Sequence, residues 1–255
     1  MTATQPAGGW RARNIAVGNY FFRHRNAVFP TLFALMALFA RPRVIGTPAL
    51  DTVLAGAGVV VALTGQAIRL LTIGYEYIER GGKEGKVYAS HLVHGGVYAL
   101  TRNPMYLGNG LIAIGMTMVA GAPAVYGVVL PFFLLVYQAL IAAEEAYLRQ
   151  RFGAEYERYC AQVNRLWPDI RRARSVLGGL SYDWRVAVRK ELSTLAGLLV
   201  GLIWLPVLRI CWFLGWSGVA GHLIWAVGWT IAVLALYGWM VYLKKMRRLF
   251  YAVET

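Results

Sequence analysis

Apolar residues along this chain are grouped into long blocks rather than the short alternating patterns of β-strands. Blocks of about 17 to 25 mostly apolar residues have the length that a helix needs to cross a bilayer. Candidate blocks lie near residues 26–40, 52–73, 105–121, 124–143, 194–215 and 220–242. The pattern predicts an all-α, polytopic transmembrane helical protein with about six spans, of which the first and third are short.

The polar stretches between these blocks divide the chain into three predicted parts. An N-terminal basic segment and the first span occupy 1–50, a core occupies 51–174, and an amphipathic segment with a two-span hairpin occupies 175–255. Within the core, a tight GAP turn at 121–123 makes the third and fourth spans a helical hairpin. Two segments outside the spans, roughly 74–104 and 144–193, form a predicted cytoplasmic layer.

Composition and charge agree with a membrane protein. The chain is 58% hydrophobic and 15% charged, with a mean hydropathy of +0.49, well above that of a soluble domain. With the N-terminus inside, all but four of the 26 Lys and Arg residues lie on the cytoplasmic side. The positive-inside rule therefore predicts cytoplasmic N- and C-termini, in a bacterial-type inner (plasma) membrane. The net charge of +14 is interpreted as a topology and lipid-headgroup signal rather than a nucleic-acid site.

Two arginines lie within the predicted spans. Arg69 is close to the cytoplasmic end of its span, so its side chain is expected to snorkel to the interface, with headgroup binding as the second interpretation. Arg209 is nearer the middle of a span, and we expect it to face a cavity or to pair internally, although the sequence identifies no partner.

The cysteines and histidines do not form a metal-binding pattern. Cys160 and Cys211 lie outside any CxxC or His/Cys cluster and are expected to be packing residues. His91 and His94 lack a third potential ligand nearby in the sequence. We therefore predict no metal site and expect both histidines to be hydrogen-bonded loop residues.

A polar stretch between two apolar blocks, residues 91–109, reads HLVHGGVYALTRNPMYLGN. Its Asn103-Pro104 step favours an extended residue followed by the start of a helix. The third span would then begin at Pro104, with its free N–H groups and positive dipole end beside Arg102 and Tyr106. The stretch thus predicts a polar site at the start of a span.

A second polar stretch, residues 142–168, reads AAEEAYLRQRFGAEYERYCAQVNRLWP. Carboxylates and aromatics recur there at steps of three and four, which places on one helix face Glu144, Glu145, Leu148, Phe152, Tyr156 and Tyr159. Gly153 is expected to interrupt this helix. Because the third and fourth spans form a hairpin, both glutamates return to the level of Arg102 and Tyr106. Such a site suits an amphoteric cofactor with a planar base, or a zwitterionic headgroup.

The motifs GVYALTRNPMYLG and EEAYLRQRFGAEYERY, followed by a closing Pro, resemble those of the membrane-embedded methyltransferases. This family includes isoprenylcysteine carboxyl methyltransferases and phospholipid N-methyltransferases, and the resemblance covers roughly residues 50–170. It implies that 51–174 is a methyltransferase-like catalytic core that binds S-adenosylmethionine in a pocket closed on the cytoplasmic side. It also implies a membrane lipid or lipidated acceptor that enters laterally from the bilayer. The oligomeric state is left open.

The resemblance implies specific site residues. Cofactor-binding positions would be His91, Leu92, Val93, Gly96, Tyr98, Arg102, Asn103, Pro104, Tyr106, Gly108, Glu144, Glu145 and Tyr156. Phe152, Gly153 and Tyr159 would help to cover the cofactor. Catalytic roles would belong to Glu145, Arg102 and Arg165: a glutamate takes the proton of an ammonium acceptor, and an arginine anchors a phosphate or carboxylate.

Two positions depart from the family pattern. Asn103 stands where the family often has His, and asparagine forms hydrogen bonds but transfers no proton at neutral pH. Gln162 stands where isoprenylcysteine enzymes tend to have Arg, and the nearest basic residue, Arg165, comes about one helical turn later. The second departure argues against a carboxyl acceptor.

Other functions also fit parts of the sequence. A small-thiol methyltransferase would have a closed pocket. A membrane NADPH-dependent reductase of related architecture would need a nicotinamide phosphate site, and the chain has no GxGxxG motif of that kind. A transporter or scaffold would have functional charges along its spans, whereas the charges here concentrate at the predicted cytoplasmic face.

Overall fold

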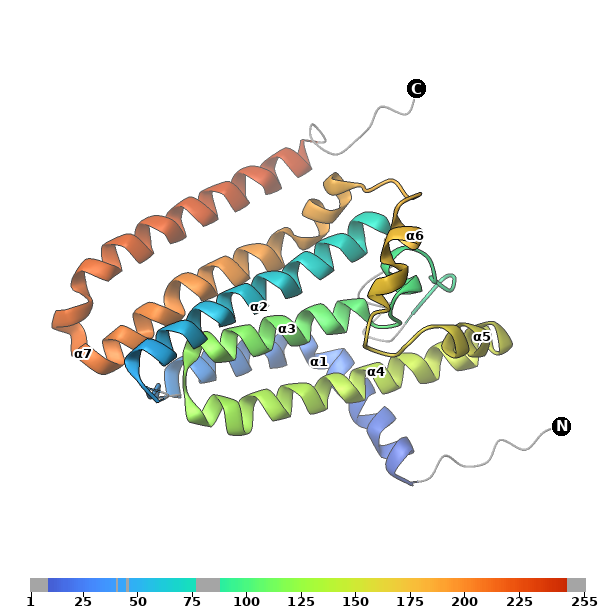
Figure 1. Ribbon diagram of the computed structural model, residues 1–255, viewed down its shortest axis with the longest axis horizontal. Helices are drawn as coiled ribbons and strands as arrows, with labels where there is room; N and C mark the ends of the chain where they lie inside the picture. Colours follow the sequence, from blue (N-terminus) through green and yellow to red (C-terminus); the bar gives the residue numbers. More distant parts are fainter. Residues whose placement is uncertain (1–8, 40, 45, 77–87, 247–255) are drawn as a thin grey trace.

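The computed structural model describes residues 9–39, 41–44, 46–76 and 88–246, and this part of the chain contains helices and no strand. The α-helices are α1 (Gly9–Phe39), α2 (Pro48–Tyr75), α3 (Pro104–Ala120), α4 (Leu130–Phe152), α5 (Ala154–Gln162), α6 (Ala173–Leu177) and α7 (Trp184–Lys245) (Figure 1). Short 3-10 helices η1 (Gly96–Ala99) and η3 (Ile170–Arg172) and a π-helical turn η2 (Val125–Val129) complete the described elements. The all-α prediction is confirmed.

Three of the described helices are long and apolar enough to cross a bilayer: Pro48–Tyr75, Val125–Phe152 and Trp184–Lys245. They contain the predicted blocks at 52–73, 124–143, 194–215 and 220–242. Helix α3 is apolar but shorter, and it coincides with the block at 105–121. The first block, at 26–40, falls in the second half of α1, with residue 40 outside the described residues.

Helix α7 is a hairpin rather than one straight rod. Gly215 breaks the helical backbone with a φ of 69°, a left-handed conformation that residues with a Cβ rarely adopt. The limbs on either side, 184–214 and 216–245, run back along each other (Figure 1). The indole of Trp204 donates to the Thr230 hydroxyl at 2.9 Å and joins the two limbs. This agrees with the predicted C-terminal hairpin.

Helices α2 and α3 pack in close antiparallel contact at two pairs of glycines. A Cβ on Gly65 would lie 2.5 Å from the carbonyl oxygen of Gly108, and one on Gly115 would lie 2.4 Å from that of Gly58. The two pairs are seven residues apart on each helix, so they lie on the same face. Small residues that allow such backbone approach are typical of helix contacts in membranes.

Glycines also mark the turns that the sequence predicted. Gly121 ends α3 with a φ of 61°, and the chain then returns through η2 and α4. Gly153 separates α4 from α5 with a φ of 51°. Pro104 is the first residue of α3. The hairpin of the third and fourth blocks, its start at Pro104 and the interruption at Gly153 are thus confirmed.

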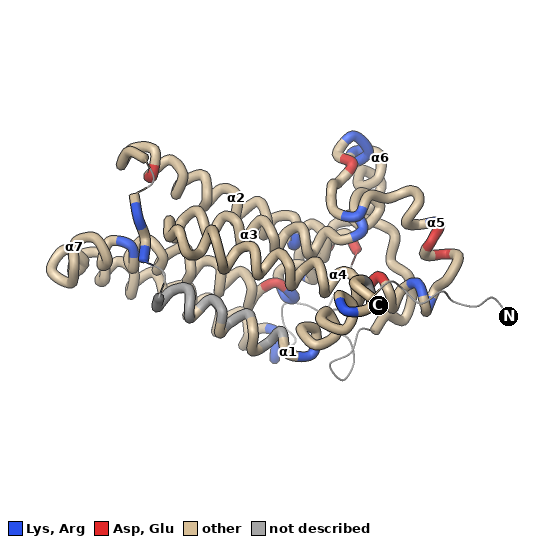
Figure 2. The backbone as a smooth tube through the Cα atoms, turned by 90° about the horizontal axis from the view of Figure 1, so that it is seen from below, with Lys and Arg blue, Asp and Glu red and all other residues tan. Residues whose placement is uncertain are grey.

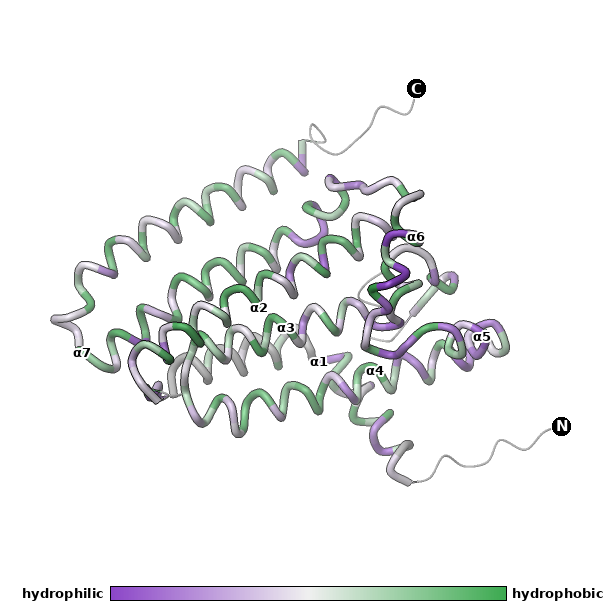
Figure 3. Tube along the Cα trace, viewed as in Figure 1, coloured by the Kyte–Doolittle hydropathy of each residue, from purple (hydrophilic) through white to green (hydrophobic). Residues whose placement is uncertain are grey.

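The short helices η1, α5, η3 and α6 gather at one end of the bundle, where α3 begins and α4 ends (Figure 1). The long helices are mostly apolar and this end is hydrophilic (Figure 3), with Lys, Arg, Asp and Glu residues around α5 and α6 (Figure 2). We call it the polar end. Part of the first segment predicted for this layer, 77–87, lies outside the described residues.

The expectation for Arg69 is wrong. Its side chain does not snorkel: the residue is 6% exposed, and its Nε donates to Glu191 Oε2 at 2.6 Å. Glu191 lies in α7, which packs against α2, so the arginine finds a counterion inside the bundle. Arg209 pairs internally, as one of the two expectations had it, with Asp51 of α2.

Candidate active site at the polar end of the bundle

The two polar motifs meet at the polar end. The backbone N–H of Arg102 donates to the Asn164 carbonyl at 2.8 Å, and the side-chain amide of Asn103 donates to the Arg165 carbonyl at 3.0 Å. Asn103 is the N-cap residue of α3, with a φ of −128° and a ψ of 54°, immediately before Pro104. The start of α3 is therefore fixed by hydrogen bonds to the loop after α5, and the predicted meeting of the motifs is observed.

A buried carboxylate, Glu145, lies among the arginines of this region. It is 7% exposed and accepts from Arg165 Nε at 2.9 Å. A terminal nitrogen of Arg102 lies 3.9 Å from the same carboxylate oxygen. The buried Nε of Arg102 has no hydrogen-bond partner among the described residues. The site thus combines the Glu145 carboxylate with two guanidinium groups, and the Nε of Arg102 is a donor that a ligand could use.

The neighbouring carboxylate, Glu144, has a different partner. The Tyr106 hydroxyl donates to its Oε1 at 2.8 Å, which ties the first turns of α3 to the last turns of α4. Tyr106 also packs edge-on against the ring of Tyr137, with 5.3 Å between ring centroids. Glu145 therefore contacts two arginines, and the adjacent Glu144 accepts a hydrogen bond from a tyrosine hydroxyl.

Aromatic side chains from α5 close the site from one side. Tyr156 and Tyr159 pack with Leu92 in a buried cluster, and the Tyr159 hydroxyl donates to the Tyr98 carbonyl at 2.8 Å. Burial raises the pKa of the Tyr156 hydroxyl, and the charge of Glu145 adds to the rise. Burial likewise raises the pKa of Tyr159, partly offset by the nearby Arg102 charge. Both hydroxyls are neutral at physiological pH.

Other predicted cofactor residues lie elsewhere. His91 is exposed and its Nδ1 is 3.0 Å from the Ser90 hydroxyl, and Val93 is half-buried in the same loop. A Cβ on Gly96, which has a φ of 51°, would lie 2.9 Å from the Cβ of Glu76 at the end of α2. Gly108 faces α2. The structure therefore shows Gly96 and Gly108 in contacts with α2.

A cleft of about 510 Å³, which the sequence did not predict, opens beside the same loop. Its lining residues are Leu92, His94, Ala99, Glu155, Arg158, Tyr159, Gln162, Val163 and Arg172. The volume is in the range of small-ligand sites. Steps of three and four along α5 indicate that Glu155, Arg158 and Gln162 share a face, whereas only the fold brings Arg172 beside them.

No three His, Cys, Asp or Glu side chains in the described ranges come together as a possible metal site. Cys160 and Cys211 are free, partly buried thiols.

The apolar helices and the polar cluster at one end of their bundle define an integral membrane protein with a candidate active site at the polar end. A family model for phospholipid methyltransferases matches residues 54–155, which contain most of α2, all of α3 and α4, Arg102 and both glutamates. The match places the chain in this family, which implies a membrane methyltransferase. The match ends before Tyr156, Arg165 and all of α7.

One relative matches a shorter stretch. The chain is 41% identical over 61 residues to an uncharacterized protein of Haemophilus influenzae, and the match covers 24% of this chain and 97% of that protein. No solved structure matches the chain.

Proposed function

We propose that this protein transfers a methyl group from S-adenosylmethionine to a membrane lipid or lipid-linked acceptor. The observation that carries the proposal is the polar cluster itself, in which buried Glu145 lies between Arg102 and Arg165 beside a second carboxylate. Charged groups in a membrane protein are costly and tend to mark functional sites. Here Arg102, Glu144 and Glu145 lie within the residues that match the methyltransferase family.

The donors and acceptors of the cluster fit the cofactor. S-adenosylmethionine combines an ammonium, a carboxylate and a sulfonium, so its recognition needs groups of both signs. Glu144 and Glu145 would hold the cationic part, and Arg102, whose buried Nε has no partner in the described part of the chain, would hold the carboxylate. The predicted cofactor residues at 91–98 would surround the rest, with Tyr156 as cover.

The cofactor brings an already activated methyl group. The protein must therefore chiefly align donor and acceptor and exclude water, which is a proximity effect rather than one that requires a nucleophilic side chain. The buried tyrosines of α5 and the hydrogen bonds between 102–103 and 164–165 would keep this end of the bundle dry and rigid.

Among acceptors, we favour the amine of a phospholipid headgroup. An ammonium must lose a proton before methylation, and Glu144, which accepts a hydrogen bond from the neutral Tyr106 hydroxyl, is our candidate for the base. Arg165, the expected anchor for a carboxyl acceptor, is already engaged by Glu145. An isoprenylcysteine-like carboxylate is the second candidate.

We also infer the arrangement in the membrane. The second half of α1, α2, α3, α4 and the two limbs of α7 would provide six spans, with the polar end and both termini in the cytoplasm of a bacterial-type inner membrane. The distribution of Lys and Arg supports this orientation. Acceptor lipids would then reach the site from the inner leaflet.

Calorimetric titration with S-adenosylhomocysteine tests the cofactor. We expect saturable binding to the detergent-purified protein and at least tenfold weaker binding to Glu145→Gln. The matched control is Glu157→Gln, which removes an exposed carboxylate of α5 that pairs with Arg149. Normal binding to Glu145→Gln would remove this cluster from the cofactor site. Binding of NADPH without S-adenosylhomocysteine would instead support a reductase.

A transfer assay with labelled cofactor tests the acceptor. Vesicles of phosphatidylethanolamine, a prenylated cysteine and a small thiol are offered separately to the same preparation. We expect label in the phospholipid, and Glu144→Gln should reduce its incorporation more than cofactor binding. Transfer only to the thiol would contradict the lipid acceptor.

A further inference from the structure

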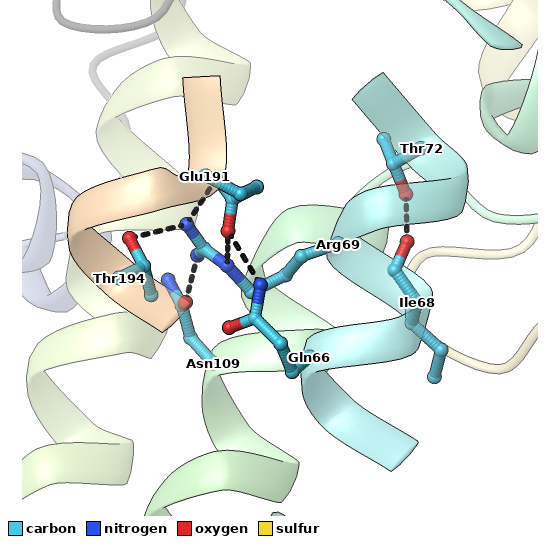
Figure 4. A network of polar contacts seen from close by, with 7 residues as sticks. All are labelled: Gln66, Ile68, Arg69, Thr72, Asn109, Glu191 and Thr194. Carbon is cyan, nitrogen blue, oxygen red and sulfur yellow. Dashed lines mark hydrogen bonds and ion pairs between the residues drawn. The ribbon is translucent and has the colours of Figure 1, made fainter. Parts of the chain in front are cut away.

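A polar network is buried between α2, α3 and the first limb of α7 (Figure 4). At its centre the Arg69 guanidinium donates to both carboxylate oxygens of Glu191, from Nε to Oε2 at 2.6 Å and from Nη2 to Oε1 at 2.8 Å. Gln66 donates to the same carboxylate at 3.1 Å, and Glu191 is 0% exposed. Arg69 also donates to the side-chain oxygen of Asn109. The two arms link α7 to α3 through one guanidinium.

The contacts continue from Asn109 to the candidate active site. The side chain of Tyr137 on α4 lies beside that of Asn109, and the Tyr137 ring packs against the ring of Tyr106. Tyr106 in turn donates to Glu144. A continuous path of contacts therefore runs from α7 to one of the two glutamates of the site.

The geometry of this network is better suited to positioning the side chains around it than to stabilising the fold. Desolvating two charges is costly, and apolar residues of similar size usually stabilise a protein as well as a buried ion pair does. A bidentate pair does, however, fix the direction of the guanidinium. Gly108 lets the arginine cross α3 closely, because a Cβ there would lie 2.6 Å from Arg69 Cγ. Rigid placement at the start of α3 is what this geometry provides.

We propose that Glu191 is a positioning residue for methyl transfer. Through Arg69 and Asn109 it fixes the first turns of α3, and with them the placement of Tyr106 and Glu144. Helix α7, which lies outside the match to the family, then contributes to methyl transfer by positioning residues of α3 and α4. This inference rests on the proposed function for its kinetic consequence.

Paired double variants separate positioning from stability. Arg69→Met with Glu191→Leu replaces the buried pair by apolar residues, and Asp51→Leu with Arg209→Met does the same at the other end of α2 and α7. We expect both proteins to fold with similar thermal stability. The first should lose on the order of tenfold to a hundredfold in kcat with little change in the KM for the cofactor, whereas the second should keep the wild-type kcat.

A single variant follows the path further. Asn109→Ala leaves the Arg69–Glu191 pair intact and removes its link to α3, so it should reproduce most of the loss in kcat. Equal kcat values for the two double variants, or a wild-type kcat for Asn109→Ala, would overturn the positioning role.

Hydrogen exchange gives a readout that needs no activity. The amides of 103–109 should exchange faster in the Arg69→Met, Glu191→Leu protein than in the wild type, and at the wild-type rate in the Asp51→Leu, Arg209→Met protein. Unchanged exchange in both would refute the positioning. If the wild type neither binds S-adenosylhomocysteine nor transfers a methyl group, the proposed function fails, and the exchange rates still decide whether Glu191 orders the start of α3.

Discussion

Two ion pairs, one buried and one partly buried, join the first limb of α7 to α2, one near each end. Arg69 pairs with Glu191 close to the candidate site, and Asp51 pairs with Arg209 close to the turn of α7. Eighteen residues separate the two positions on each helix, or about 27 Å along the axis. The pairs therefore specify the same antiparallel register, with the acid and the base exchanged between the helices.

The two pairs differ in what surrounds them. Arg69 contacts a side chain of α3 that leads to Tyr106 and Glu144. Arg209 instead donates to the backbone carbonyl of Val119 at 3.3 Å and lies against Gly121, where a Cβ would be 2.7 Å from its Cζ. The Asp51–Arg209 pair thus contacts the turn after α3, whereas the Arg69–Glu191 pair is connected through Asn109 to the candidate active site. The same chemistry holds helix register at one end and connects to the site at the other.

The largest expected effect comes from removing one partner of the near pair. Glu191→Ala leaves the Arg69 charge buried without its counterion, which costs about 3–5 kcal/mol of unfolding free energy. Asp51→Ala should cost less, because the Arg209 side chain is 11% exposed and keeps a backbone partner. Denaturant unfolding in detergent micelles measures both. Equal losses would show that burial does not distinguish the two ends.

The glycine contacts between α2 and α3 give a second comparison between the end near the candidate site and the far end. Gly108→Ala and Gly115→Ala each push a methyl group into the backbone of α2 and should cost about 1–3 kcal/mol. Only Gly108→Ala displaces Arg69, so only this variant should also lower kcat. The control is Gly110→Ala, which meets no atom within 4 Å and should keep both stability and activity. A similar loss of kcat in Gly115→Ala would contradict a special role for the near end.

The sequence predicted much of this arrangement because the signals were local. Apolar blocks located the helices, Pro104 and Gly121 marked the start and end of α3, and the three- and four-residue steps after Glu144 placed carboxylates and tyrosines on one face. The closeness of Arg102 and Glu145 followed from a single hairpin with a short turn, so few alternative arrangements were possible.

The near pair could not be predicted in the same way. Arg69 and Glu191 are 122 residues apart in the chain, and Glu191 lies in the part that the sequence predicts as an amphipathic segment before the two-span hairpin. Pairing them requires the register of α7 on α2, which depends on side-chain packing over the whole interface. By contrast, Gly58 and Gly65 have the same seven-residue spacing as Gly108 and Gly115. This local pattern alone could have predicted the close contact between α2 and α3.

A smaller effect is expected where the path reaches the site. Tyr106→Phe removes the hydrogen bond to Glu144 and leaves the ring packed against Tyr137, so kcat should fall about tenfold, equivalent to roughly 1.4 kcal/mol, with little loss of stability. Tyr20→Phe, which alters an exposed tyrosine of α1, is the control. If Tyr106→Phe keeps the wild-type kcat, the path from α7 ends before the carboxylate.

The smallest effect concerns alkaline pH at the polar end. Burial raises the pKa of Tyr156 and Tyr159 in the folded protein, whereas an unfolded tyrosine has a pKa near 10. Above about pH 10 the unfolded state therefore loses these protons first, and the stability that is fully present at lower pH declines as pH rises. The melting temperature should fall between about pH 9 and 11, and more steeply in the wild type than in Tyr156→Phe with Tyr159→Phe. Equal slopes in the wild type and the double variant would show that the tyrosines of α5 do not couple this end of the bundle to pH.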